Sequence, residues 1–305
     1  MSFANATKIE IANNKSFRSK TKIAQAYGLF LFAKSFTLDT IHLQTENKEL
    51  ADLYVFFASD MIGIEGTLTV KERKRQNKRF YVATVDDRAD RERIFNFFGY
   101  DPMLPLLDIT LLDTKEKIAS FLSGVYMACG HINDPQNSYH LEFVFKNEEI
   151  AKIVGNLIEC ILVQPKIISR RGDYILYFKE SEQIEDVFTL MGATKATMQI
   201  MDVKMLKELR NNVNRVTNCE TANIERTVNA AYQQIEDIKF IFNKYGEDYL
   251  SGDLKEIAKI RLYNPDMSLQ ELSQESGVEL SRSGIHYRLK KITDLAKHIR
   301  DSEYG

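Results

Sequence analysis

The sequence has few of the features that mark secreted, membrane-spanning or disulfide-bonded proteins. Its three cysteines, Cys129, Cys160 and Cys219, are an odd number and form no CxxC pair, which argues against a disulfide framework and fits a reducing cytosol. The N-terminus, MSFANATKIEIANN, lacks the charged and then apolar pattern of a signal peptide. No apolar run approaches the ~20 residues that cross a bilayer. We therefore expect a cytoplasmic protein that uses no membrane.

The sequence also lacks the short motifs of several enzyme classes. Neither GxxxxGKS nor GxGxxG occurs, and there is no GxSxG nucleophile elbow, so we expect no nucleotide-driven enzyme, no hydrolase of that type and no small-molecule substrate. A large excess of positive charge is missing too, because the formal net charge is −2. Any contact with nucleic acid must therefore use local basic patches.

What is present is one order of predicted elements that occurs twice in a chain of 305 residues. Hydrophobic periodicity predicts a helix, a strand, a helix, two strands and a helix. In the first copy these are residues 20–34, 36–44, 46–62, 66–72, 79–85 and 91–98, and in the second copy 114–130, 139–146, 148–163, 166–169, 173–179 and 181–190. Ala33 matches Cys129 at a distance of 96 residues, and Arg79 matches Asp173 at 94. The chain therefore predicts two tandem copies of one supersecondary unit.

The composition changes after Gly192, where strand-like runs end and an Asn-rich segment, residues 210–223, follows. We expect an α+β domain over 1–192, with repeats at about 20–100 and 114–192, then a helical linker over 193–222 and an all-α domain over 223–305. From Ile224 to Phe242 apolar residues recur every three or four positions, which predicts a helix with a continuous seam that packs on its own domain. A shorter helix over 253–263 follows.

The C-terminal domain carries the pattern of a helix-turn-helix. Ser268 with Glu271 has capping-box spacing, Gly277 supplies a turn, and Ser281 can cap a second helix. Ile285, Leu289 and Ile292 form the buried stripe of that helix, and its other side carries Arg282, Ser283, His286, Arg288, Lys290 and Lys291, with Lys297 further along. A basic helix after a tight turn is suited to the DNA major groove. The alternative is a solvated surface helix, in which the helix dipole favours cations near the C-terminus.

A second basic cluster is expected at the tips of the two hairpins. In the first copy it consists of Lys71, Arg73, Lys74, Arg75, Lys78 and Arg79, and in the second copy of Lys166, Arg170 and Arg171. Together the hairpins could form a saddle that contacts the phosphate backbone without reading sequence. Charged hairpin tips also occur simply for solubility, so this alternative stays open.

The helix that ends in LSGVYMACG, residues 122–130, resembles the packing helices of LAGLIDADG homing endonucleases. Gly28 and Gly124 lie inside the two matching helices, where a missing side chain lets two backbones approach. Such a nuclease holds Mg²⁺ with one carboxylate at the end of each helix. The equivalent positions here are Ala33 and Cys129, and neither supplies an oxygen ligand, so catalysis by that route should be absent.

Two other metal sites can be imagined near this helix. Asp134 in GHINDP could replace a lost carboxylate, but Asn-Asp-Pro more often makes a turn in which the Asp bonds the backbone. A zinc site from Cys129, His131 and His140 has no recognised ligand spacing and lacks a fourth ligand. We therefore expect no metal site.

Longer segments make the chain similar to the WhiA family of sporulation and cell-division regulators. They are the start MSF, FLSGVYMACGHINDPQNSYHLEF, LMGATKA, RNNVNRVTNCETANIERTVNAAYQQI and RLYNPDMSLQELSQESGVELSRSGIHYRLKKI. The resemblance implies an inactive two-repeat LAGLIDADG domain joined to a helix-turn-helix like the promoter-reading domain of sigma factors. It also implies a bacterial transcription factor or a nucleoid-linked division protein without a cofactor, with the recognition helix at residues 281–292.

Together these observations predict a sequence-preferring regulator that binds double-stranded promoter DNA in the bacterial nucleoid. Its links would be to sporulation, cell division and chromosome segregation, and it would have no nuclease activity. We place Arg282, Ser283, His286 and Arg288 nearest the bases, and Lys290, Lys291 and Lys297 on phosphates. One alternative is an adaptor that binds a co-regulator or a chromosome-organising protein, with incidental DNA contact. Another is a residual metal-dependent nickase that uses Asp134.

Overall fold

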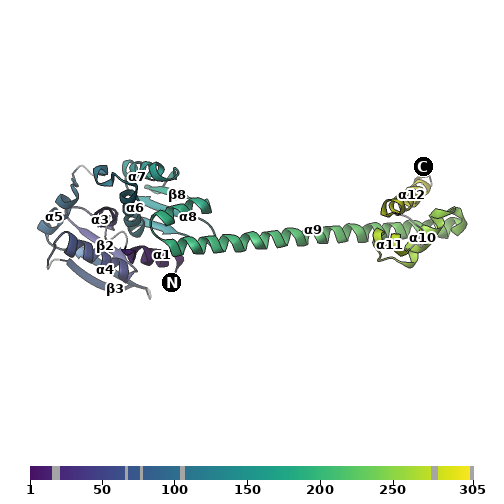
Figure 1. The fold of residues 1–305 in the computed structure, drawn as a ribbon, viewed down its shortest axis with the longest axis horizontal. Coiled ribbons are helices and arrows are strands. Elements are labelled where there is room, and N and C mark those ends of the chain that lie inside the picture. The colour runs from purple at the N-terminus through teal and green to yellow at the C-terminus, as the bar shows by residue number, and fades with distance from the viewer. Residues whose placement is uncertain (16–20, 66–67, 76–77, 104–106, 276–280, 303–305) are drawn as a thin grey trace. The chain divides into compact units, whose positions relative to one another are not determined.

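A computed structural model describes residues 1–15, 21–65, 68–75, 78–103, 107–275 and 281–302 (Figure 1). The chain divides into two compact units, Met1–Lys207 and Glu208–Gly305. This division falls inside one helix, α9 (Thr194–Tyr245). The domain limits 1–192, 193–222 and 223–305 stay a prediction.

Each repeat of the first unit contains an antiparallel sheet of four strands. The strands of the first sheet are β1 (Ser35–Phe36), β2 (Ile41–Thr45), β3 (Leu68–Arg75) and β4 (Lys78–Val85), and those of the second are β5 (Gly130–Ile132), β6 (Leu141–Phe145), β7 (Lys166–Arg170) and β8 (Asp173–Phe178). The spatial orders are β1-β2-β4-β3 and β5-β6-β8-β7. The same order in both sheets confirms the tandem duplication. The single strand expected over 36–44 is wrong, since a turn separates β1 from β2.

Helices α3 (Lys22–Leu31) and α6 (Lys115–Cys129) form the centre of this unit. A Cβ atom built on Gly28 would lie 2.3 Å from the carbonyl oxygen of Phe121, and one on Gly124 would lie 2.1 Å from that of Gln25. The expected glycine seam is therefore confirmed. The remaining helices are α4 (Lys48–Phe56), α5 (Arg88–Phe98), α7 (Glu148–Ile161) and α8 (Ser181–Leu190).

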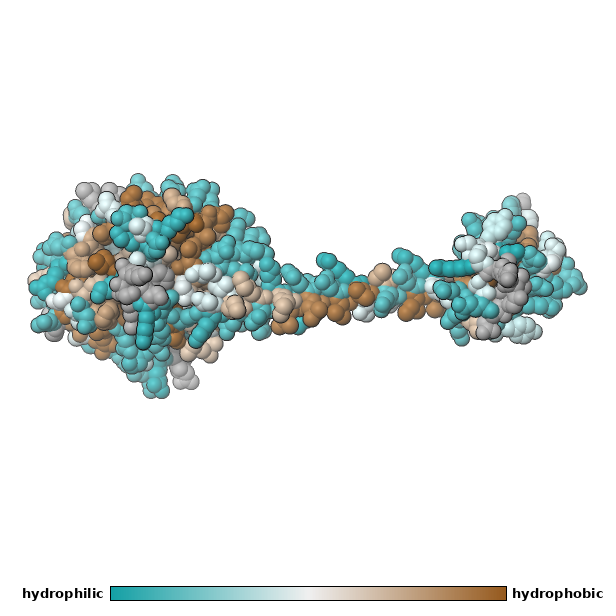
Figure 2. Space-filling view, viewed as in Figure 1, coloured by the Kyte–Doolittle hydropathy of each residue, from teal (hydrophilic) through white to brown (hydrophobic). Residues whose placement is uncertain are grey.

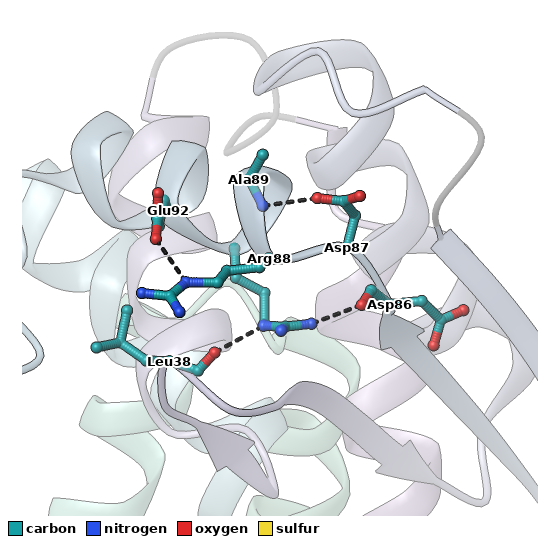
Figure 3. Close-up of polar contacts among 7 residues, drawn as sticks. Leu38, Asp86, Asp87, Arg88, Ala89 and Glu92 are labelled. Atoms are coloured by element: carbon teal, nitrogen blue, oxygen red, sulfur yellow. Dashed lines mark hydrogen bonds and ion pairs between the residues drawn. The ribbon is translucent and has the colours of Figure 1, made fainter.

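Helix α5 is fixed to its sheet by polar contacts (Figure 3). Asp87 caps the helix by accepting a hydrogen bond of 2.6 Å from the Ala89 N–H. The Arg91 guanidinium donates to the backbone carbonyls of Leu38 at 2.8 Å and Asp86 at 2.7 Å. Leu38 precedes β2 and Asp86 follows β4, and the start of β2 pairs with the end of β4. Arg91 therefore ties one end of the sheet to α5, at the base of the β3–β4 hairpin.

A helix that the sequence pattern did not indicate, α1 (Phe3–Ala12), packs against α6, α4 and β5. Ile11 is fully buried. Glu10 accepts hydrogen bonds from the backbone N–H groups of Lys195, at 2.6 Å, and Ala196, at 3.0 Å. A carboxylate is favourable at that position, since the first N–H groups of α9 have no partner within the helix.

The second unit consists of the later part of α9 with α10 (Asp253–Tyr263), α11 (Leu269–Glu275) and α12 (Arg282–Asp301). Its core includes Ile238 of α9, which is fully buried. Farther toward the N-terminus of α9 the expected seam is wrong, because Ile224 is 64% and Val228 59% exposed. Figure 2 shows apolar side chains gathered along this part of α9. Among the described residues no helix is long and apolar enough to cross a membrane.

Candidate nucleic-acid interface

Two hydrogen-bonded caps define the helices α11 and α12. The Ser268 N–H donates to the Glu271 carboxylate at 2.7 Å, and the Glu271 N–H donates to Ser268 Oγ at 3.3 Å, as a capping box requires. Ser281 Oγ accepts a hydrogen bond of 3.2 Å from the Gly284 N–H and so begins α12. The capping predictions are confirmed. Gly277, the predicted turn residue, lies outside the described residues.

Helix α12 separates an apolar side from a basic side. Ile285, Leu289 and Ile292 are fully buried, as the sequence predicts. Arg282, Ser283, His286, Lys290, Lys291 and Lys297 are exposed. Three of these, Arg282, His286 and Lys290, are spaced by four residues, so they lie one above another on a single face of the helix. We call them, with the adjacent Ser283, the α12 stripe.

A neighbouring face of α12 carries an aromatic residue that the sequence analysis did not select. The Tyr287 side chain is 59% exposed. The Lys291 Nζ atom lies 4.8 Å from the centre of the Tyr287 ring, which is the geometry of a cation–π contact. Lys291 therefore lies beside the α12 stripe rather than within it. In the sequence Tyr287 stands between His286 and Arg288, and this position among basic residues could have indicated an exposed aromatic side chain.

Arg288 does not lie on the open face where the sequence placed it. Its Nη2 atom is 2.8 Å from Oδ2 of Asp253 on α10, and its side chain is only 22% exposed. The hydrogen bond from Arg288 holds the pKa of the Asp253 carboxyl below its ordinary value. Similarly, Arg300 donates to Asp237 on α9 at 2.6 Å. Arg288 and Arg300 are thus both neutralised within the unit.

The cations of the first hairpin are divided between the two faces of the sheet by strand alternation. Ala83 is fully buried, so residues paired level with it face the helices, and the next residues face away. Lys71 and Arg73 belong to the outer face by register, whereas Lys74 and Arg79 belong to the helix-side face. The side chains of Lys71, Arg73, Lys74 and Arg79 are exposed, and those of Arg75 and Lys78 lie outside the described part of the structure.

The second hairpin presents a less basic outer face. Arg170 lies opposite Asp173 in the strand register, and Asp173 forms an ion pair of 2.5 Å with Lys146. Ile168 and Lys166 lie on the same face of β7 as Arg170, because they alternate along the strand. Ile168 is 40% exposed, and Lys166 is exposed as well. The tip residue Arg171 has a positive φ of 54° and is exposed. The two hairpins therefore differ in charge.

The ends of the central helices hold no oxygen ligand for a metal. Helix α3 ends at Leu31, two residues before Ala33, while α6 ends at Cys129 itself. Cys129 packs against the core, and burial raises the pKa of its thiol to about 12. Burial also lowers the pKa of the nearby Lys8 amine to about 8, although the charge of Cys129 opposes that shift.

The other metal positions considered from the sequence are used structurally. Asp134 Oδ1 accepts a hydrogen bond of 2.9 Å from the Gln136 N–H, so this carboxylate stabilises a turn. His140 contacts Glu142 at 3.2 Å, and His131 is exposed. Within the described residues no group of three or more His, Cys, Asp or Glu side chains could hold a metal ion.

Curated relatives match the chain along its whole length. A protein of Thermoanaerobacter pseudethanolicus called "Probable cell division protein WhiA" is 34% identical over 314 residues, which cover 99% of each chain. The chain belongs to the WhiA family. A WhiA relative from Clostridium perfringens with the same name is 33% identical over 316 residues, which cover 100% of each chain.

Family models and a solved structure agree with this assignment. The model "WhiA LAGLIDADG-like domain" matches residues 118–210, and "WhiA C-terminal HTH domain" matches residues 213–296. Full-length DUF199/WhiA from Thermotoga maritima matches with a TM-score of 0.58 and 23% identity, over 98% of this chain and 99% of that one. This WhiA protein therefore has the expected α+β fold, a LAGLIDADG-like domain followed by a helix-turn-helix.

Proposed function

We propose that this WhiA protein is a transcription regulator that binds double-stranded DNA with sequence preference through α12. The observation that carries the proposal is the exposed α12 stripe, which lies on a helix whose apolar side is fully buried. The core fixes the axis of α12, and the cap at Ser281 places Arg282 and Ser283 in its first turn. The N-terminal residues of a recognition helix are those that contact base edges.

The individual roles follow from position on α12. Arg282, Ser283 and His286 contact bases, while Lys290, Lys291 and Lys297 contact phosphates on either side of the groove. Arg288 is assigned a positioning role, because its bond to Asp253 braces α12 against α10.

The basic hairpins supply a second, sequence-independent contact with the phosphate backbone. On the outer face of the first sheet the exposed cations are Lys71 and Arg73, and on that of the second sheet they are Lys166 and Arg170, with Arg171 exposed at the hairpin tip. Such contacts add affinity and fix orientation without reading sequence. Lys74 and Arg79 lie on the opposite face, so they contribute through the general field of the hairpin.

The cellular role is proposed from the relatives, which are called probable cell division proteins. This chain would bind promoter regions in the bacterial nucleoid, in the cytoplasm, and would link transcription to sporulation, cell division and chromosome segregation. It needs no cofactor for this.

We also propose that the LAGLIDADG-like domain does not cleave DNA. The side chain of Ala33 has no atom that binds a metal, and the thiol of Cys129, with a pKa of about 12, stays protonated at neutral pH. A hard Mg²⁺ ion requires oxygen ligands at both helix ends. Supercoiled plasmid should remain intact after incubation with the full chain and either Mg²⁺ or Mn²⁺, whereas nicked circles would contradict this part of the proposal.

The experiment that tests DNA recognition begins with selection of a preferred duplex from a random pool by the full chain. Arg282→Ala should weaken binding to that duplex by about 1 to 3 kcal/mol and leave binding to a scrambled duplex nearly unchanged. Arg215→Ala is the matched control, because Arg215 is exposed on α9 and belongs to neither α11 nor α12. Equal losses on both duplexes would show that Arg282 contributes charge alone.

A second candidate function, an adaptor for a protein co-regulator, is supported by exposed apolar residues of α9. Leu209 is 61%, Val213 56% and Val216 58% exposed, and their spacing places them on one face of the helix. A photo-crosslinking residue at position 213 should capture a protein in cells, while one at Asn211, on another face, should not. Similar labelling from both positions would remove the support for an adaptor.

A further inference from the structure

The second unit contains a basic cavity of about 330 Å³, to which the proposed DNA contacts give no role. It is enclosed by α9, α10, α12 and the start of α11. Its polar lining consists of Arg226, Thr227, Gln234, Arg261, Ser268, Gln270, Arg282 and His286. None of the described lining residues carries a carboxylate, so three arginines line the cavity without an acidic residue among them.

Arg261 of α10 is the deepest of the three arginines, since it is only 2% exposed. Its Nη1 atom donates to the carbonyl of Met267 at 2.6 Å. Its Nε atom is buried and has no hydrogen-bond partner among the described residues. A buried cation is costly unless an anion and hydrogen-bond acceptors compensate it.

Gln234 of α9 provides a second unsatisfied group in the same cavity. Its side chain is 9% exposed, and its Oε1 atom has no partner within the described part of the chain. A buried amide oxygen requires a hydrogen-bond donor. Neither of the two atoms is accessible from solvent, so what the cavity itself offers a ligand is the positive charge of its arginines.

We propose that this cavity binds the phosphate group of a small phosphate ester, an anion that compensates the charge of the buried Arg261. Guanidinium groups suit phosphate because their parallel N–H groups match two of its oxygens. The volume lies at the lower end of the range for small-molecule sites. A phosphate of the DNA backbone has the same chemistry, but the buried position of Arg261 favours a free ligand that enters the cavity.

The position of Arg282 and His286 gives this site a consequence for DNA binding, and this step rests on the proposed function. Both residues belong to the α12 stripe and also line the cavity. A bound phosphate would hold the Arg282 guanidinium inside the cavity and remove it from the bases. The phosphate ester would therefore act as a competitive regulator of DNA binding.

Direct binding can be measured without DNA, by the broadening of the ³¹P signal of inorganic phosphate on titration with the full chain at constant ionic strength. The wild-type chain should show one saturable site. Arg226→Ala, at the exposed rim, should weaken that site about tenfold, as expected for the loss of one charge-assisted hydrogen bond. Arg215→Ala, an exposed arginine of the same helix outside the cavity, should leave it unchanged. Equal, unsaturable broadening by all three chains would overturn the proposal.

A second arm distinguishes a free ligand from a DNA phosphate. In phosphate-free buffer Arg226→Ala should bind duplex DNA as the wild type does, and inorganic phosphate should inhibit the variant about tenfold less effectively than the wild type. If Arg226→Ala instead weakens DNA binding and lowers the salt slope by about one, the cavity holds a backbone phosphate and the small-ligand proposal is wrong. If the full chain binds phosphate but no DNA, the proposed function is wrong and the phosphate site stands.

Discussion

Arg288 of α12 and Asp253 of α10 form an ion pair of 2.8 Å that joins the two helices. The same arginine lies close to the carbonyl of Gly284, one turn earlier in α12, at 3.4 Å. Arg288, whose spacing in the sequence suggests base contact, is thus engaged within the unit, where it links α12 to α10.

This relationship predicts different effects for two arginines of α12. Arg288→Ala should lower affinity for the selected and the scrambled duplex by similar factors, since a misoriented α12 loses all contacts together. Arg282→Ala should affect only the selected duplex. Fluorescence anisotropy titrations of both variants check this. Asp253→Asn should reproduce the Arg288→Ala pattern, and a purely sequence-selective loss in either variant would refute the bracing role.

The contact between α3 and α6 predicts a sensitive position in the first unit. Gly124→Ala should lower the free energy of unfolding by about 1 to 3 kcal/mol, because its Cβ would overlap the backbone of Gln25. Gly155→Ala in α7 is the matched control, since the nearest atom to its Cβ would be a Leu176 methyl at 3.6 Å. That change should be neutral or stabilising by up to ~1 kcal/mol. Urea unfolding of both variants measures these changes. Equal stabilities of Gly124→Ala and Gly155→Ala would contradict the close contact between α3 and α6.

The three cysteines should react at very different rates with an alkylating reagent at pH 8. Cys160 and Cys219 are exposed, whereas burial raises the pKa of the Cys129 thiol to about 12. Because the thiolate is the reactive form, Cys129 should react roughly 10³-fold more slowly than the other two. Its rate should rise with pH through the whole alkaline range. Mass spectrometry after timed labelling checks this, with urea-denatured chain, in which all three react, as the control.

Lys290 should contribute to DNA affinity through charge alone. Lys290→Ala is expected to reduce the slope of log affinity against log salt by about one unit, on any duplex, because one phosphate contact is lost. Titrations at several salt concentrations measure the slope. Lys239→Ala, exposed on α9, serves as the control. An unchanged slope in Lys290→Ala would place that residue away from the backbone.

Local patterns predicted much of the fold correctly. The caps at Ser268 and Ser281, and the buried stripe that includes Leu289, depend on neighbours within four residues, so the sequence contains them fully. The glycine seam was accessible because Gly28 and Gly124 occur at equivalent positions of the two repeats.

Features that depend on long-range contacts were not accessible from the sequence. Helix α9 is continuous from Thr194 to Tyr245, whereas the sequence predicted a helical linker over 193–222 and a separate helix from Ile224, and helix propensity alone does not decide whether the two join. The burial of Arg261 and the pairing of Arg288 with Asp253 depend on how α10 and α12 pack. A basic pattern predicts how many cations a helix carries but not which of them remain free.

The central claim is that α12 reads duplex sequence while the central helices no longer cut it. Affinities of the full chain for its selected duplex and for a scrambled one, measured with Mg²⁺ present and with duplex integrity monitored, test both halves. The account predicts a ratio of at least about 10³ between the two affinities and uncut DNA. Equal affinities, or cleaved DNA, would contradict it.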